Sequence, residues 1–224
     1  MLIGHYSAAL AAKAVKPQLP LWQLFIAAQL VDIVWVLLCA FNIERFTINP
    51  SLNSNPLELI FQPFTHSLLA SGLWSLAAAL LVVGLYRLYR PAAWLLGAVV
   101  ASHWLLDFFV HRPDLPIWPG VKVGLALWDY SLVAMSLEMA LIALAGGYLW
   151  RNQTHGKGWY AGLTVVLLAL VAVNYVLPPP LDKTGILLGA MAVYLIAPVV
   201  AWWLERRVRK PCIHAMENSY AQQS

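Results

Sequence analysis

Charged residues are scarce in this sequence of 224 residues: 14 Lys and Arg and 10 Asp and Glu make up 11% of the chain. Soluble globular proteins carry about 25% charged residues, so the composition excludes an ordinary soluble domain. Cysteine is also rare, and Cys39 and Cys212 do not suggest a disulfide framework. The net charge of +4 is small and lies at the ends of apolar segments, so we expect no nucleic-acid partner.

Long apolar runs dominate instead. Hydrophobic residues make up 61% of the chain, and about 20 consecutive apolar residues let a helix cross a bilayer. We therefore predict an all-α, polytopic helical membrane protein with six transmembrane helices, at 21–41, 63–86, 92–110, 123–150, 158–177 and 185–205. The apolar run at 2–15 is too short to span, and we expect a half-membrane helix there.

These spans consume most of the length, which predicts a single integral-membrane domain over residues 1–224. Ionisable residues within the apolar segments concentrate in its first two thirds. We therefore expect site-bearing helices in 1–150, scaffold helices in 151–205 and a basic cytoplasmic tail in 206–224. The expected surroundings are the lipid bilayer.

The distribution of basic residues predicts the orientation, because cytoplasmic loops carry an excess of Lys and Arg. With both termini in the cytoplasm, ten basic residues lie inside: Lys13, Lys16, Arg87, Arg90, Arg151, Lys157, Arg206, Arg207, Arg209 and Lys210. Four lie outside: Arg45, Arg112, Lys122 and Lys183. The loops 42–62, 111–122 and 178–184 are then non-cytoplasmic.

Positive side chains are absent from the six predicted spans until the polar end of the last one, yet acidic and imidazole groups are present. They are Asp32, His66, His103, Asp107, Asp129 and Glu138. Carboxylates in hydrocarbon are costly and mark functional sites by default. Without basic partners they must be protonated, solvated in a cavity or neutralised by a cation. The neighbouring imidazoles favour a divalent transition metal, zinc above all, as one or two ions.

The depths of these residues favour a common site. At a rise of about 1.5 Å per residue, Asp32 and His103 lie about 16 Å from the cytoplasmic starts of their helices. His5 and Glu138 reach similar depths, at about 15 and 18 Å. His66 and the further candidates His111 and Asp129 lie nearer the external face. A site open to that face follows if the helices turn these residues toward one another.

The third span contains the sharpest local pattern, with His103, Asp107 and His111 spaced four residues apart. This spacing places the three side chains on one helical stripe, about 5–6 Å apart. The alternative is structural, with His103 and Asp107 hydrogen-bonded to each other between helices. Thr65-His66-Ser67 could likewise be a helix start, and Asp129 an interfacial residue.

Together, Gly4-His5, Asp32 in the first span, Thr65-His66-Ser67 and His103-x-x-x-Asp107 resemble the YdjM-like inner-membrane metal-dependent hydrolases. The resemblance covers roughly residues 1–115. It implies a helical enzyme of the bacterial inner membrane, with a metal site distantly similar to zinc-dependent phospholipase C. It also implies phosphoester hydrolysis, with five metal ligands: His5, Asp32, His66, His103 and Asp107.

The leading hypothesis is therefore a metal-dependent hydrolase of a lipid-linked or other phosphoester, acting from the non-cytoplasmic side. Asp107 or Glu138 would take a proton from water, and Arg112 would hold the phosphate. A metal or proton transporter is the alternative, because intramembrane carboxylates also line ion paths. A non-catalytic haem-binding or assembly protein is the third hypothesis, but it leaves the carboxylates unexplained.

The basic bias generates the first testable prediction, which concerns the C-terminus. A reporter that is active only in the cytoplasm, fused after Ser224, should be active, because ten basic residues against four favour cytoplasmic termini. A matched fusion in the 42–62 loop should be inactive. Activity of a periplasm-only reporter at the C-terminal position would overturn the orientation.

Overall fold

The computed structural model describes residues 1–86, 90–118 and 120–221. Arg87 and residues 222–224 of the basic tail lie outside these ranges. The described residues are mostly helical, with seven α-helices: α1 (Tyr6–Val15), α2 (Leu21–Ala40), α3 (Leu68–Tyr86), α4 (Arg90–Val110), α5 (Ser131–Asn152), α6 (Lys157–Val176) and α7 (Lys183–Ala221). A 3₁₀ turn, η1 (Leu127–Asp129), precedes α5.

Five of these helices are long and apolar enough to cross a membrane: α2, α4, α5, α6 and α7 up to Val208. A helix suits that role because all its backbone polar groups are satisfied within the segment. The sixth predicted span, at 63–86, corresponds to α3, whose described apolar stretch Leu68–Gly84 is shorter. Six spans are thus not confirmed. Proline marks several ends: Pro20 precedes α2, and Pro178 follows α6.

Two predicted spans begin later than expected. Residues 63–67 precede α3, because the buried Glu44 carboxylate accepts hydrogen bonds from the backbone of Phe64 and Thr65 and so satisfies groups that a helix would otherwise use. The segment from 123 to 130 likewise precedes α5. There Leu125 and Ala126 donate backbone hydrogen bonds to Phe108 and His111 at the end of α4.

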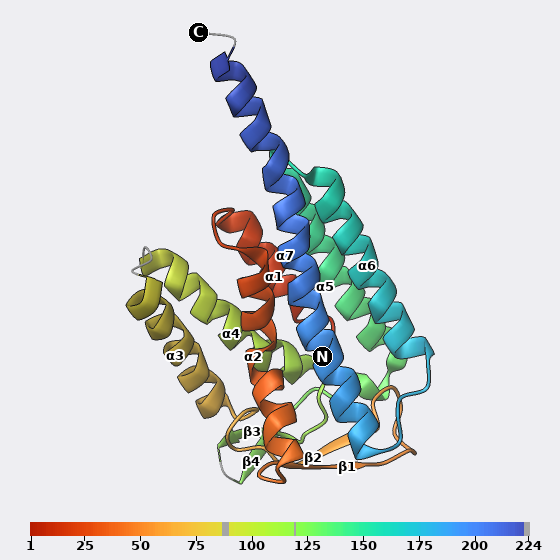
Figure 1. Cartoon of the computed structure of the whole chain (residues 1–224). Helices are drawn as coiled ribbons and strands as arrows, with labels where there is room; N and C mark the ends of the chain where they lie inside the picture. The colour runs from red at the N-terminus through yellow and green to blue at the C-terminus, as the bar shows by residue number, and fades with distance from the viewer. Residues whose placement is uncertain (87–89, 119, 222–224) are drawn as a thin grey trace.

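Short β-hairpins, which an all-α prediction does not include, occupy two outer connections. β1 (Arg45–Ile48) pairs antiparallel with β2 (Leu57–Phe61), and β3 (Leu115–Trp118) pairs with β4 (Val121–Val123). These connections are not helical, so their backbone N–H and C=O groups form hydrogen bonds between paired strands and not within a helix. Both hairpins lie at the same end of the helical bundle (Figure 1).

The short helix α1 lies inside the bundle, where it contacts α2, α4 and α5. Its small and apolar residues allow close approach: Ala9 and Leu10 are fully buried, and Tyr6 packs against Phe25 of α2. Around it, α3 packs against α4, α2 against α7, and α5 against α6 (Figure 1). The start of α1 is thereby held in the interior of the protein.

A buried ion pair links α1 to α7 near the end of the bundle opposite the hairpins. Lys13 of α1 donates to Glu205 of α7 across 2.5 Å, and both side chains are buried. Lys13 also donates to the carbonyl oxygens of Pro17 and Leu19, while Glu205 accepts from the backbone of Leu21. One buried pair therefore joins α1, the start of α2 and α7.

Removing one partner of this pair should destabilise the protein strongly. Glu205→Ala leaves the Lys13 charge buried, and we expect a loss of about 3–5 kcal/mol in the free energy of unfolding. Thermal unfolding in detergent, followed by tryptophan fluorescence, measures this. Glu58→Ala, on a hairpin, is the matched control and should cost much less. A Glu205→Ala variant as stable as the wild type would contradict a structural role for the pair.

Candidate metal centre

Five buried ligand-type residues meet near the middle of the bundle. His5 immediately precedes α1, Asp32 lies on α2, and His103 and Asp107 lie on α4, while His66 comes from the segment before α3. Each of the five is at most 6% exposed. The structure therefore brings together all the residues that the sequence predicts as metal ligands.

The first group consists of His5, His103 and Asp107. His5 Nε2 lies 3.2 Å from Asp107 Oδ1, and His103 Nε2 lies 3.2 Å from Asp107 Oδ2. The two imidazole rings stack with their centroids 3.7 Å apart. The spacing of four residues in α4 places His103 and Asp107 on one stripe, as the sequence predicts.

The second group consists of Asp32, His66 and His103. Asp32 Oδ1 lies 3.2 Å from His66 Nε2 and 3.5 Å from His103 Nε2. His66 Nε2 is also 3.8 Å from Asp107 Oδ2. The two groups share His103, and the contact between His66 and Asp107 joins them further, so they form one continuous centre.

The spacing of these atoms fits a metal ion such as zinc. Ligand atoms about 2.0–2.1 Å from a tetrahedral zinc ion lie about 3.3 Å from one another, and in each group one ligand atom per residue lies within 4.8 Å of the others, with individual His–carboxylate distances of 3.2–3.5 Å. His103 Nε2 and both ring nitrogens of His5 are buried without a hydrogen-bond partner. Unpartnered buried nitrogens are costly, and coordination would satisfy those that face the ion.

Neighbouring groups orient two of the imidazoles. His103 Nδ1 donates to the carbonyl oxygen of Ala28 at 3.0 Å, which directs Nε2 toward the carboxylates. His66 Nδ1 lies 2.9 Å from Thr65 Oγ1, which donates in turn to Glu44. A hydrogen bond at Nδ1 that leaves Nε2 free is the usual arrangement around a metal-ligating histidine.

Hydroxyl groups from the last two spans reach both sides of the centre. Tyr194 of α7 donates to Asp32 Oδ2, and Tyr175 of α6 donates to Glu138 Oε1, each at 2.8 Å. Residues 151–205 were expected to serve as scaffold, so these two contacts were missed. Their signal in the sequence is a tyrosine within an otherwise apolar span.

Glu138 lies beside the five-residue centre and belongs to neither candidate group. Its Oε2 accepts a hydrogen bond from the backbone of Gly4 at 3.0 Å, and Oε1 accepts from Tyr175. The amino group of Met1 donates to Asp107. Glu138 therefore positions the segment that carries His5.

The remaining site candidates lie farther out. His111 Nε2 is 3.8 Å from Asp107 Oδ2, and His111 Nδ1 pairs with Asp114 at 3.2 Å. Arg112 pairs with Asp129 at 2.7 Å and donates to the carbonyl oxygens of Asn53 and Asn55. The structure thus places His111 next to the centre. Arg112 and Asp129 lie apart from the centre, where Arg112 holds the loop at 53–55 by hydrogen bonds to its carbonyl oxygens.

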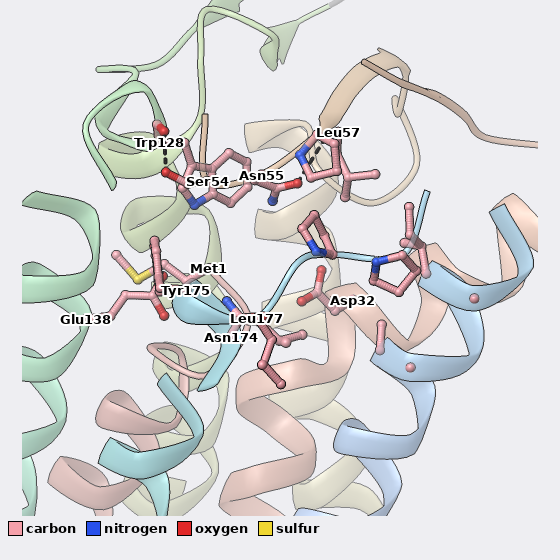
Figure 2. A pocket seen from close by; sticks show the side chains of 18 of the residues that line it. Met1, Asp32, Ser54, Asn55, Leu57, Trp128, Glu138, Asn174, Tyr175 and Leu177 are labelled. Carbon is pink, nitrogen blue, oxygen red and sulfur yellow. Dashed lines mark hydrogen bonds between the residues drawn. The ribbon is translucent and has the colours of Figure 1, made fainter. Parts of the chain in front are cut away.

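A cavity of about 340 Å³ adjoins the centre, and Asp32, His66, His111 and Glu138 contribute polar groups to its wall. Figure 2 shows Glu138, Met1 and Tyr175 on one side of the cavity, Asp32 on another, and Ser54, Asn55 and Trp128 across from them. Ser54 Oγ donates to the carbonyl oxygen of Trp128 at 2.6 Å and so fixes the loop over the cavity. The cavity therefore lies beneath the loop that joins β1 and β2.

Comparisons with models of protein families, with curated proteins and with solved structures found no match. The family resemblance stated above accordingly remains an expectation, and the chemistry of this centre is argued from its own residues.

Because His103 belongs to both candidate groups, its removal should lower metal content most. We expect His103→Ala protein to lose most of the transition metal that copurifies with the wild type, and to melt at a lower temperature. His155→Ala, at an exposed position, is the matched control and should retain the metal. Elemental analysis of protein purified without chelator measures both variants. Folded wild-type protein without any transition metal would contradict a metal centre.

Proposed function

We propose that the protein is a membrane-embedded, metal-dependent hydrolase that acts on a lipid-linked phosphoester from the non-cytoplasmic side. The observation that carries this proposal is the meeting of three imidazoles and two carboxylates inside an apolar bundle, beside a cavity to whose wall two of them, Asp32 and His66, contribute. His5, Asp32, His66, His103 and Asp107 would hold one or two ions, with zinc favoured by the mixed nitrogen and oxygen ligands.

When bound by these residues, a divalent ion would supply an acidified water and polarisation of a phosphoryl oxygen. Asp107 would accept the proton of that water through Oδ2, which lies 3.8 Å from Nε2 of His66 and from Nε2 of His111, two residues that line the cavity. Both Glu138 oxygens already accept hydrogen bonds, so Glu138 acts by positioning. Arg112 orders the loop that borders the cavity.

The proposed topology places six spans in a bacterial inner membrane, with α3 as the sixth, and both termini in the cytoplasm. Two features support it: the ten-to-four basic bias, and the position of both hairpins and the α6–α7 link at the end opposite the α1–α2 and α5–α6 links (Figure 1). The cavity then faces the non-cytoplasmic side, where a lipid headgroup can enter it.

The competing hypotheses are less well supported. A transporter needs a path across the bundle, but the buried core formed by Tyr6, Leu10 and Phe25 lies on the opposite side of the centre from the cavity. A haem-binding protein needs space for a macrocycle beside an axial histidine, but the His5 and His103 rings stack 3.7 Å apart. Hydrolysis accounts for the carboxylates, the imidazoles and the cavity together.

Asp107→Asn tests the chemistry, because it nearly preserves shape but removes the carboxylate. Metal-replete wild-type protein in liposomes should release phosphate or headgroup from phospholipids, phosphatidic acid or polyprenyl phosphates. We expect Asp107→Asn to lower turnover by about 10²-fold or more. Asp182→Asn, an identical change at an exposed position, should turn over like the wild type. Equal release by Asp107→Asn and wild type would identify a contaminant and reject the proposal.

A further inference from the structure

The cavity has two chemically different ends. The polar end is formed by Asp32 and His66 of the candidate metal centre together with His111 and Glu138. The other end lies between the outer parts of α6 and α7, where Val173, Leu177, Ile186 and Ala190 form a mainly apolar wall with Asn174 as a polar group in it. A ligand that fills this cavity must therefore be polar at one end and apolar at the other.

The packing of the helices explains why the apolar end lies there. α6 packs against α5, and α7 packs against α2, so these two consecutive helices belong to different pairs. Toward the Lys13–Glu205 end they share the buried core, through residues such as Leu167 and Leu204. Toward the hairpins the cavity lies between them, closed at the edge by Pro178, Pro179 and Pro180.

The rim of this part of the cavity is suited to the bilayer. Val176 and Leu177 at the end of α6 are 75% and 58% exposed, and Leu188 on α7 is 67% exposed. Large apolar side chains with this exposure, on helices that can span a membrane, contact lipid. An alkyl chain can then pass between α6 and α7 without leaving an apolar environment.

We propose that the outer parts of α6 and α7 form a port for the hydrocarbon chain of a long-chain alkyl phosphoester, whose phosphate lies at the candidate metal centre. This inference rests on the proposed function and specifies its substrate class. A cavity of about 340 Å³ is at the small end of the range for small-molecule sites, about 300–1,000 Å³. It suits the headgroup and the first part of a chain, so the remainder lies in the bilayer.

Gly189 determines what fits in this port. It lines the cavity from α7, and a Cβ atom added there meets no atom within 4 Å. At Gly185, one turn earlier, an added Cβ would lie 3.0 Å from Pro180 Cβ. A larger side chain at position 189 therefore fits beside the port without disturbing the packing of α7, whereas one at position 185 forces a shift.

A photoreactive lipid analogue tests the port. The probe is hexadecyl phosphonate with a diazirine in its chain, because its carbon–phosphorus bond resists hydrolysis. With metal-replete wild-type protein in liposomes, we expect cross-links at 173–177 of α6 and at 186–190 of α7. Gly189→Leu should lower probe affinity about tenfold, equivalent to about 1.4 kcal/mol. Gly162→Leu, an exposed position on α6 where an added Cβ also meets open space, is the matched control and should bind normally.

The outcomes separate the port from the proposed hydrolysis. Cross-links confined to other helices, or equal binding by Gly189→Leu and wild type, would overturn the port. Hydrolysis itself is tested by turnover of the soluble ester bis(para-nitrophenyl) phosphate together with the long-chain lipid phosphates. If the wild type turns over none of them, the proposed function fails. The cross-link positions in the wild type decide the port in either case, even if a variant fails to fold.

Discussion

The structure depends on how two buried carboxylates, Asp32 and Asp107, are compensated inside an apolar bundle. Removing an ion from water costs several kcal/mol even after the protein relaxes. Among the described residues, no Lys or Arg side chain forms an ion pair with either carboxylate. Their neighbours are three imidazoles, the Met1 amino group and the Tyr194 hydroxyl. The Met1 ammonium pairs with Asp107, and the three imidazoles with the two carboxylates could hold a metal ion.

This requirement accounts for much of the architecture around the centre. The short helix α1 is buried so that His5 reaches Asp107, and Glu138 holds the preceding backbone at Gly4. The segment before α3 is not helical, because the Glu44 carboxylate accepts a hydrogen bond from the backbone of Thr65. In this conformation His66 points toward Asp32. The wider bundle supplies hydroxyls and a cavity. The position of the five ligand-type residues thus depends on particular contacts made by the elements around them.

The sequence predicted the helical membrane character from its apolar runs, the common depth of His5, Asp32 and His103, and the shared stripe of His103 and Asp107, because these are local properties. The inclusion of His66 in the set came from the family resemblance. It misplaced the starts of the segments at 63 and 123, where contacts from Glu44 and from the end of α4 replace helical hydrogen bonds. The sequence did not reveal the partners of Arg112, which pairs with Asp129 and donates directly to the carbonyl oxygens of Asn53 and Asn55. Such partners are distant in sequence, and no periodic pattern reveals them. Tyr175 and Tyr194 were missed for the same reason.

X-ray absorption spectroscopy of the protein purified without chelator tests the central claim most directly, because it reports both the element and its ligands. A metal held by His5, Asp32, His66, His103 and Asp107 predicts a zinc edge with nitrogen and oxygen neighbours at about 2.0–2.2 Å and the multiple scattering of imidazole. A signal dominated by sulfur at about 2.3 Å, or a folded protein without any transition metal, would contradict it.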